Sequence, residues 1–308
     1  MNLSHLLKMV FIGLVQGLTE PLPISSSAHM IICQKILNID VLNINIEILI
    51  NFASCLAIGL FFYKKIYYLF KNTITNKKEV YPHLNRSFLL KLIIASIPIA
   101  ITGFLFKDTI EIFFSSTLLI GIFLIITSLF LFQISCILKK KKHLNDQISY
   151  IDSIIIGLFQ GLAIFPGISR SGTTFFSGVS RNIRLSSLFD FSFFLYLIAS
   201  IGSLVLSFFS FDIISFVKEQ NIFILLIVFV ITFISTLISI NLFHKILSQK
   251  TIYFFFFYTF FLGLFLIITN LLLLIPIQFW FYFHNVIVKV RCFNGLFTNY
   301  YNNTTKCK

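Results

Sequence analysis

Charged residues are scarce in this chain: Asp, Glu, Lys and Arg together make up 11% of its 308 residues. Soluble domains carry about a quarter charged residues, so this scarcity excludes an ordinary soluble fold. Hydrophobic residues reach 57%, and apolar runs of the ~20 residues needed to cross a bilayer recur along the chain. A transmembrane β-barrel would show short alternating segments instead. The composition therefore predicts a polytopic helical membrane protein.

Several familiar functional signals are also missing. The five cysteines show no CxxC or other metal-type spacing, and there is no P-loop pattern. The N-terminal stretch lacks a basic region and a small-residue cleavage site, so we do not expect a cleaved signal peptide. A net charge of +13 would suggest nucleic acid for a soluble protein, but the Lys and Arg of membrane proteins gather in loops on one face. We therefore expect no nucleic-acid partner.

Six apolar stretches are predicted to span the membrane. They are residues 44–63, 88–107, 113–138, 188–210, 222–246 and 252–275. Two basic loops, 64–86 and 139–142, are separated by two of these spans and therefore lie on the same face. The positive-inside rule places that face in the cytoplasm.

Two further apolar stretches, "GLVQGLTEPLPISSSAHM" (13–30) and "GLFQGLAIFPGISRSGTT" (157–174), are broken by Gly, Pro and hydroxyl residues. Shifted by 144 residues, so that Gly157 falls on Gly13, they are identical at eight of the first fifteen positions. Non-helical backbone at membrane depth must be buried in protein or line a wet cavity, so each stretch predicts a re-entrant, broken-helix hairpin. Three spans follow each copy, so the copies enter from opposite faces, as in an inverted-topology repeat.

The predicted fold is an all-α integral membrane protein with two re-entrant hairpins and six full transmembrane helices. We expect one membrane domain over residues 1–275, with repeat one at about 5–138 and repeat two at about 150–275. The polar tail, 282–308, is rich in Asn and Thr and is expected to be disordered.

The second broken stretch has the composition of a phosphate cradle. Pro166 and Gly167 interrupt the helix, and a new helix is predicted to begin near Ser169, with its positive dipole end toward the break. Arg170 supplies a planar fork suited to phosphate oxygens. Further hydroxyl donors are Ser169, Ser171 and Thr174.

The first broken stretch supplies reactive groups. Gln16 and Glu20 share a helix face, and His29 lies one turn beyond Ser26, within reach of its hydroxyl. A Ser beside a His is a minimal activated nucleophile, a His can itself attack phosphorus, and a Glu can hold a divalent ion or orient water. Spacing does not choose among these roles. A structural alternative is a buried Glu20–Arg170 ion pair that locks the hairpins together.

These residues resemble the undecaprenyl-diphosphatase family, also called the bacitracin-resistance protein family, over about residues 5–275. Its first motif, [E/Q]-G-x-x-E…P-x-S-S-x-x-H, is matched by Gln16, Gly17, Glu20, Pro23, Ser25, Ser26 and His29. Its second motif, P-G-x-S-R-S-G-x-T, is matched by Pro166, Gly167, Ser169, Arg170, Ser171, Gly172 and Thr174.

The resemblance implies an enzyme of the bacterial inner membrane that hydrolyses undecaprenyl diphosphate to undecaprenyl phosphate. Such an enzyme recycles the lipid carrier for peptidoglycan synthesis and gives bacitracin resistance. The resemblance also implies a site open to the periplasm and a divalent cation, Mg²⁺ or Ca²⁺. The catalytic set would be Glu20 (with the metal or water), Ser26, His29 and Arg170, and the substrate-binding set Gln16, Ser25, Ser27, Ser169, Ser171 and Thr174. The oligomeric state stays open, a homo-oligomer included.

The chain departs from the family pattern outside these motifs. It reads "NFASC" at 51–55, lacks the usual Pro in "FSFFLYLIASIG" (191–202), and has Tyr258-Thr259 where Tyr-Arg is common. Inverted repeats with broken helices are also transporter architecture, so a transporter or flippase of an anionic prenyl lipid is the alternative function. A third interpretation is a structural membrane protein that has lost its activity. A carrier has no evident need for Glu20, Ser26 and His29 together.

Overall fold

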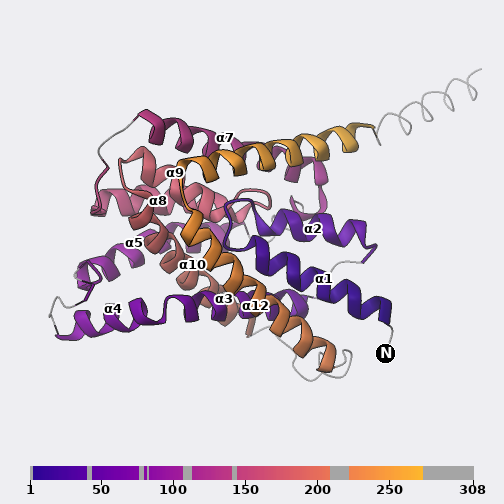
Figure 1. Cartoon of the computed structure of the whole chain (residues 1–308), viewed down its shortest axis with the longest axis horizontal. Helices are drawn as coiled ribbons and strands as arrows, with labels where there is room; N and C mark the ends of the chain where they lie inside the picture. The colour runs from indigo at the N-terminus through magenta and orange to yellow at the C-terminus, as the bar shows by residue number, and fades with distance from the viewer. Residues whose placement is uncertain are drawn as a thin grey trace, which may run out of the picture.

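The computed structural model describes residues 3–39, 44–75, 80–81, 83–106, 113–140, 144–208 and 222–272. The helices, which Figure 1 colours from indigo to yellow, are α1 (Leu3–Thr19), α2 (Ser26–Ile36), α3 (Ile44–Phe61), α4 (Tyr63–Thr75), α5 (Arg86–Leu105), α7 (Thr117–Lys140), α8 (Tyr150–Gly161), the short η1 (Leu162–Ile164), α9 (Arg170–Ser180), α10 (Leu185–Phe208), α12 (Ile222–Ile246) and a final helix, Gln249–Leu272. The predicted tail, 282–308, lies outside the described residues.

Within the described ranges, five helices are long and apolar enough to cross a membrane: α5, α7, α10, α12 and the final helix. A sixth span results if the bent pair α3 and α4 is counted as one. The all-helical, multi-pass prediction is therefore confirmed. Two shorter apolar helices, α1 and Tyr150–Ile164, begin the predicted hairpins.

Helix α4 differs from the prediction, which had a loop begin at Lys64. The chain bends by 68° after α3 and continues as a helix. One face of α4 buries Leu69 and Asn72, and the Asn72 amide donates to the carbonyl of Leu84 at 2.9 Å. Lys65 donates to both carboxylate oxygens of Asp190 in α10, at 2.6 and 2.7 Å. This basic segment is helical because its apolar face and its lysine both find partners in the bundle.

The two broken stretches fold with the same spacing. Helix α2 and helix α9 have bounds that differ by the 144 residues of the sequence repeat (Ser26–Ile36 and Arg170–Ser180). Ser25 caps α2 by accepting from Ala28 N–H, and Ser169 caps α9 by accepting from Gly172 N–H. A hydroxyl at the N-cap satisfies a backbone donor that the break leaves without a helical partner. The helix start predicted near Ser169 is thus confirmed.

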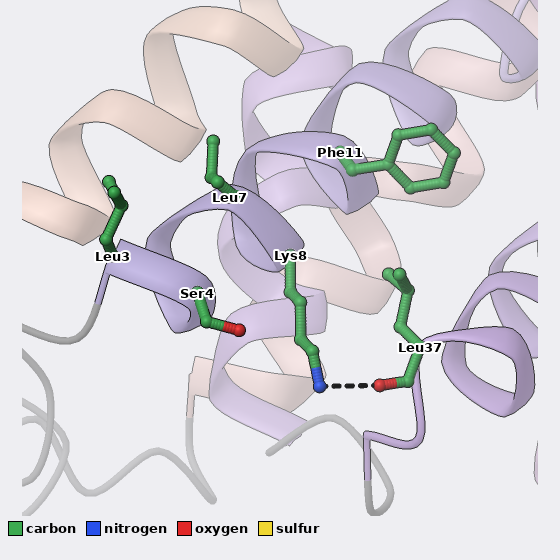
Figure 2. Close-up of a pocket in the computed structure, with 6 residues that line it drawn as sticks. All are labelled: Leu3, Ser4, Leu7, Lys8, Phe11 and Leu37. Atoms are coloured by element: carbon green, nitrogen blue, oxygen red, sulfur yellow. Dashed lines mark hydrogen bonds between the residues drawn. The ribbon is translucent and has the colours of Figure 1, made fainter.

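A hydrogen bond joins the two helices of each hairpin at the end opposite the break. The bonded residues of the two hairpins again lie 144 positions apart in sequence. In the first, Lys8 Nζ donates to the carbonyl of Leu37 at 2.7 Å, as Figure 2 shows. In the second, Arg181 Nε donates to Asp152 Oδ1 at 2.8 Å. The hollow around Lys8 in Figure 2 is lined mainly by apolar side chains.

Each hairpin packs against the other half of the chain. Helix α1 lies on α12, where a Cβ on Gly17 would come 2.5 Å from the carbonyl oxygen of Thr232. Helix α8 lies on α5, where a Cβ on Gly157 would come 2.5 Å from the carbonyl oxygen of Ala95. Small residues allow this backbone approach, because helices in a membrane associate largely by close packing. The two halves therefore interlock through their broken helices.

Candidate active site

The two breaks meet inside the bundle. The Gly167 N–H donates to Ser25 Oγ at 3.1 Å, and Ser171 Oγ donates to the carbonyl of Leu22 at 3.3 Å. From α7, Thr127 Oγ1 donates to the carbonyl of Gly167 at 2.8 Å and accepts from Ser169 N–H at 3.0 Å. Gly167 has a φ of +106°, which glycine adopts without the strain that a side chain would add. Irregular backbone at this depth is thus bonded to protein groups.

A polar cavity of about 240 Å³ lies beside the breaks. Its lining joins residues of both hairpins to the start of α3 and the last turns of α10: Glu20, Glu47, Ile48, Asn51, Arg170, Tyr196, Ser200, Ser203 and Leu204. Glu20 and Arg170, the two charged residues predicted from opposite hairpins, therefore share one cavity. This is the candidate active site.

Glu20 is the centre of a short hydrogen-bond chain. Its Oε2 accepts from Ser26 Oγ at 2.5 Å and from Gln16 Nε2 at 3.0 Å. Gln16 Nε2 also donates to Asn51 Oδ1 at 2.9 Å. A carboxylate that accepts a hydrogen bond from a serine hydroxyl is placed to act as the general base for that serine.

His29 has different partners from those that the spacing predicts. Its Nδ1 lies 2.7 Å from the carbonyl oxygen of Ser25, and its Nε2 lies 2.7 Å from the hydroxyl of Tyr258 in the final helix. The Ser26 hydroxyl turns instead to Glu20. Ser26 is the first residue of α2 and faces back toward the end of α1, while the His29 ring reaches the carbonyl of the preceding turn. Ser26 and His29 therefore each form hydrogen bonds with other residues, and the structure shows no hydrogen bond between their side chains.

Arg170 is held by α10. Its guanidinium carbon lies 5.0 Å from the centre of the Tyr196 ring, and Nη1 donates to Ser200 Oγ at 3.4 Å. A cation over an aromatic face is attracted by the ring quadrupole and keeps its remaining N–H groups for other acceptors. Among the residues that the structure describes, no ion pair within 4.0 Å joins Arg170 to Glu20. The alternative of a locking ion pair finds no support in this geometry.

The other predicted hydroxyls lie in the frame of the breaks. Ser25 and Ser169 are N-caps, and each has its Oγ near that of the serine two residues later, Ser27 or Ser171. Thr174 Oγ1 lies 2.6 Å from Ser192 Oγ and is 1% exposed. These side chains are not on the cavity wall. Each break frees backbone groups at membrane depth, and the hydroxyls are their partners.

Sequence reasoning missed part of the cavity wall. Tyr196, Ser200 and Ser203 recur at helical spacing along one face of α10, and Glu47 and Asn51 do so on α3. Polar residues at intervals of three or four inside an apolar span were the available signal. Tyr258 stands where the family commonly has Tyr-Arg, but its contact with His29, 229 residues away in sequence, was not predicted.

Gln160 occupies the position of Gln16 in the second hairpin, but its surroundings differ. Its side chain is 0% exposed, and neither amide atom has a hydrogen-bond partner among the described residues. The Gln16 amide, in contrast, is bonded to Glu20 and Asn51. The two hairpins thus share helix bounds and N-cap positions, and they differ in the backbone conformation of the N-cap and in polar chemistry.

Comparison with known proteins identifies the family. Residues 9–265 match the profile of the bacitracin resistance protein BacA. The chain belongs to the BacA family. Among its BacA relatives, undecaprenyl-diphosphatase 2 of Bacillus thuringiensis is 35% identical over 272 residues, which cover 86% of this chain and 97% of the relative. The BacA motifs of both hairpins fall inside the matched region.

Two further relatives come from other organisms. Undecaprenyl-diphosphatase of Thermosipho africanus is 37% identical over 246 residues, covering 80% of this chain and 93% of the relative. Undecaprenyl-diphosphatase of Acholeplasma laidlawii is 36% identical over 274 residues, covering 84% and 95%. The similarity spans nearly the whole of each relative.

Proposed function

We propose that this protein hydrolyses undecaprenyl diphosphate to undecaprenyl phosphate, and so recycles the lipid carrier of peptidoglycan synthesis and gives bacitracin resistance. One observation carries the proposal: the Ser26 hydroxyl is bonded to the Glu20 carboxylate, and Glu20 shares a cavity with Arg170. A nucleophile, a base and a phosphate-binding cation are the groups that diphosphate hydrolysis needs.

The geometry favours Ser26 over His29 as the attacking group. Ser26 Oγ would form a bond to the terminal phosphorus while its proton passes to Glu20 Oε2. The anhydride P–O bond breaks, and undecaprenyl phosphate leaves with the bonding electrons. Water then forms a bond to the phosphorus while the bond from phosphorus to Ser26 Oγ breaks. Glu20 returns its proton to Ser26 Oγ, inorganic phosphate leaves with the hydroxyl of the water, and the other proton of the water passes to solvent. Both ring nitrogens of His29 already have partners, so its ring is less available for attack.

Arg170 would bind the phosphoryl oxygens. Tyr196 and Ser200 hold the guanidinium in place. Its remaining N–H groups can then form two parallel hydrogen bonds to a phosphate. Such a fork stabilises the charge that spreads over the equatorial oxygens during phosphoryl transfer.

The proposal includes a divalent cation, Mg²⁺ or Ca²⁺, in the cavity. Among the described residues no three His, Cys, Asp or Glu side chains form a metal-binding group. The cavity nevertheless presents the oxygens of Glu20, Glu47 and Asn51, and Mg²⁺ is often held by one or two carboxylates together with substrate phosphates. We assign Glu20 as the cation ligand; a bound cation would neutralise phosphate charge.

Several features support an inverted-topology repeat. The helix bounds, the N-caps and the closing bonds of the two hairpins all recur at 144 residues, and each hairpin packs against the other half. Three spans after each hairpin would make the hairpins enter from opposite faces. A long prenyl tail cannot leave the bilayer cheaply, at ~0.8 kcal/mol per buried CH₂. Hairpins that meet inside the membrane bring the charged groups to such a substrate.

The cavity would open on the periplasmic face of the inner membrane. Its walls come from the first turns of α3 and the last turns of α10. The basic segments around Lys65 and Lys139 lie at the opposite ends, after α3 and after α7. Because basic loops favour the cytoplasm, the mouth of the cavity faces away from it.

Phosphate release by detergent-purified protein tests the function. We expect release from undecaprenyl diphosphate with Mg²⁺ or Ca²⁺ present, and its loss in Ser26→Ala, Glu20→Ala and Arg170→Ala. Ser187→Ala, at a half-buried serine that donates to Asp146 away from the cavity, is the matched control and should keep full activity. Transport cannot be observed in detergent, so a folded but inactive wild-type protein would favour the anionic-lipid carrier or a structural protein that has lost its activity.

A further inference from the structure

His29 and Tyr258 form a close pair between α2 and the final helix. The Tyr258 hydroxyl lies 2.7 Å from Nε2 of His29, and the two rings are stacked, with centroids 5.6 Å apart and planes 9° from parallel. His29 is 8% exposed. Its other nitrogen, Nδ1, lies 2.7 Å from the Ser25 carbonyl oxygen.

The partners determine which nitrogen carries the proton. A carbonyl oxygen only accepts, so Nδ1 must be the N–H donor to Ser25. In a neutral ring Nε2 is then an acceptor, and the Tyr258 hydroxyl donates to it. The bond from Tyr258 thus stabilises one tautomer of His29, the tautomer that can hold the Ser25 carbonyl.

Ser25 needs such support because its backbone is unusual. Its φ is +66°, a left-handed region that residues with a side chain rarely adopt. Its side chain accepts from Gly167 N–H, and its carbonyl receives His29 Nδ1–H. The next residue is Ser26, whose hydroxyl is directed at Glu20. The conformation of Ser25 therefore decides where the Ser26 hydroxyl points.

We propose that Tyr258 is a positioning residue for the reaction: it fixes the Nδ1–H tautomer of His29, and His29 in turn holds the Ser25 turn that aims Ser26 at Glu20. The kinetic part of this inference rests on the proposed diphosphatase function. The inference also gives the final helix a part in the site, although Tyr258 lies 229 residues from His29 in sequence.

The hydroxyl can be separated from the ring. A Phe at position 258 would keep the stacking against His29 and remove only the donor. Tyr253, on the same helix, packs its ring against Phe256 and Phe257 and is 43% exposed. Tyr253→Phe is therefore the matched control for loss of a tyrosine hydroxyl from this helix.

The experiment measures the His29 tautomer directly, by nitrogen NMR of the detergent-solubilised protein labelled with ¹⁵N-histidine. The His29 signals are assigned by their absence in His29→Gln. We expect the Nδ1–H tautomer in the wild type and in Tyr253→Phe, and a mixture with the Nε2–H tautomer in Tyr258→Phe. In phosphate-release assays, Tyr258→Phe should lower kcat about tenfold, the loss of one hydrogen bond's contribution, and change KM less than about twofold.

The inference fails if wild-type His29 is cationic or has Nε2 protonated, or if Tyr258→Phe leaves the tautomer unchanged. It also fails if the tautomer shifts and kcat stays at the wild-type value. Should Tyr258→Phe not fold, 3-fluorotyrosine at this position keeps the shape and strengthens the donor, and the Nε2 signal must then move. An inactive wild type would count against the diphosphatase function alone, because the NMR measurement needs no turnover.

Discussion

The Ser25 hydroxyl accepts a hydrogen bond from the backbone N–H of Gly167, so the break in one hairpin is bonded to the break in the other. The two residues lie 142 positions apart. The same hydroxyl caps α2 through Ala28 N–H. One side chain therefore both begins a helix and joins the two hairpins.

Removing this hydroxyl should loosen both hairpins. In Ser25→Ala, two buried N–H groups lose their acceptor, and the free energy of unfolding should fall by about 1–3 kcal/mol. Thermal unfolding in detergent measures this, with Ser187→Ala, at a half-buried serine, as the control. Phosphate release should fall as well, because Ser26 follows directly. A melting temperature equal to that of the control would show that the bond to Gly167 contributes nothing.

The contact of α1 with α12 should not tolerate a side chain at Gly17. A new Cβ would meet the Ser235 side chain and the Thr232 carbonyl oxygen, so Gly17→Ala should destabilise the protein by about 1–3 kcal/mol. At Gly202 in α10 a Cβ meets nothing within 4 Å, so Gly202→Ala should be neutral or stabilise by about 0.5–1 kcal/mol. Equal melting temperatures for the two variants would contradict the close packing.

Gln16 and Gln160 should respond oppositely to the same substitution. Gln160→Met removes a buried amide that has no hydrogen-bond partner among the described residues, so the free energy of unfolding should rise by about 1–3 kcal/mol and the melting temperature with it. Gln16→Met removes the bonds to Glu20 and Asn51, and should lower both stability and phosphate release. If Gln160→Met instead lowered stability, the Gln160 amide would have a partner in the working protein.

Arg170 should not be replaceable by lysine. An ammonium group cannot reproduce the guanidinium fork or its stacking on Tyr196, so Arg170→Lys should lose about 2–3 kcal/mol of transition-state stabilisation. That corresponds to a fall of about 30- to 150-fold in kcat/KM for a prenyl diphosphate. Arg184→Lys, at an exposed arginine paired with Asp146, is the control and should change the value little. Near-normal turnover by Arg170→Lys would remove the argument for a bidentate phosphate contact.

Much of the fold could be predicted because bilayer thickness determines the length of apolar runs. The start of α9 could be predicted as well, since Pro166 and Gly167 cannot continue a helix and Ser169 is a strong N-cap. Helix α4 was missed because its lysines suggested a loop. Its stability comes from contacts such as Lys65 with Asp190, which are distant in sequence.

The site could be predicted as a set of residues, but not as a set of bonds. The sequence placed Glu20 and Arg170 together, because hairpins of opposite entry meet at their breaks. It did not reveal that Ser26 turns to Glu20, a choice that depends on the angle between α1 and α2. Tyr196 was missed, and so was the contact of Tyr258 with His29. Each tyrosine reaches the site from a different, distant span, where only tertiary packing decides which side chain points inward.

Thr127 has a consequence for how the reaction meets solvent. Its single hydroxyl forms hydrogen bonds with the carbonyl of Gly167 and the N–H of Ser169, on the two sides of Ile168. Without these bonds, the two backbone groups would need water as a partner. The second hairpin is thus sealed on its α7 side by a side chain. In the proposed reaction, hydrolytic water and the phosphate headgroup would then reach Ser26 through the same cavity. A bound headgroup would block the path of water, so water would attack only after the first product departs.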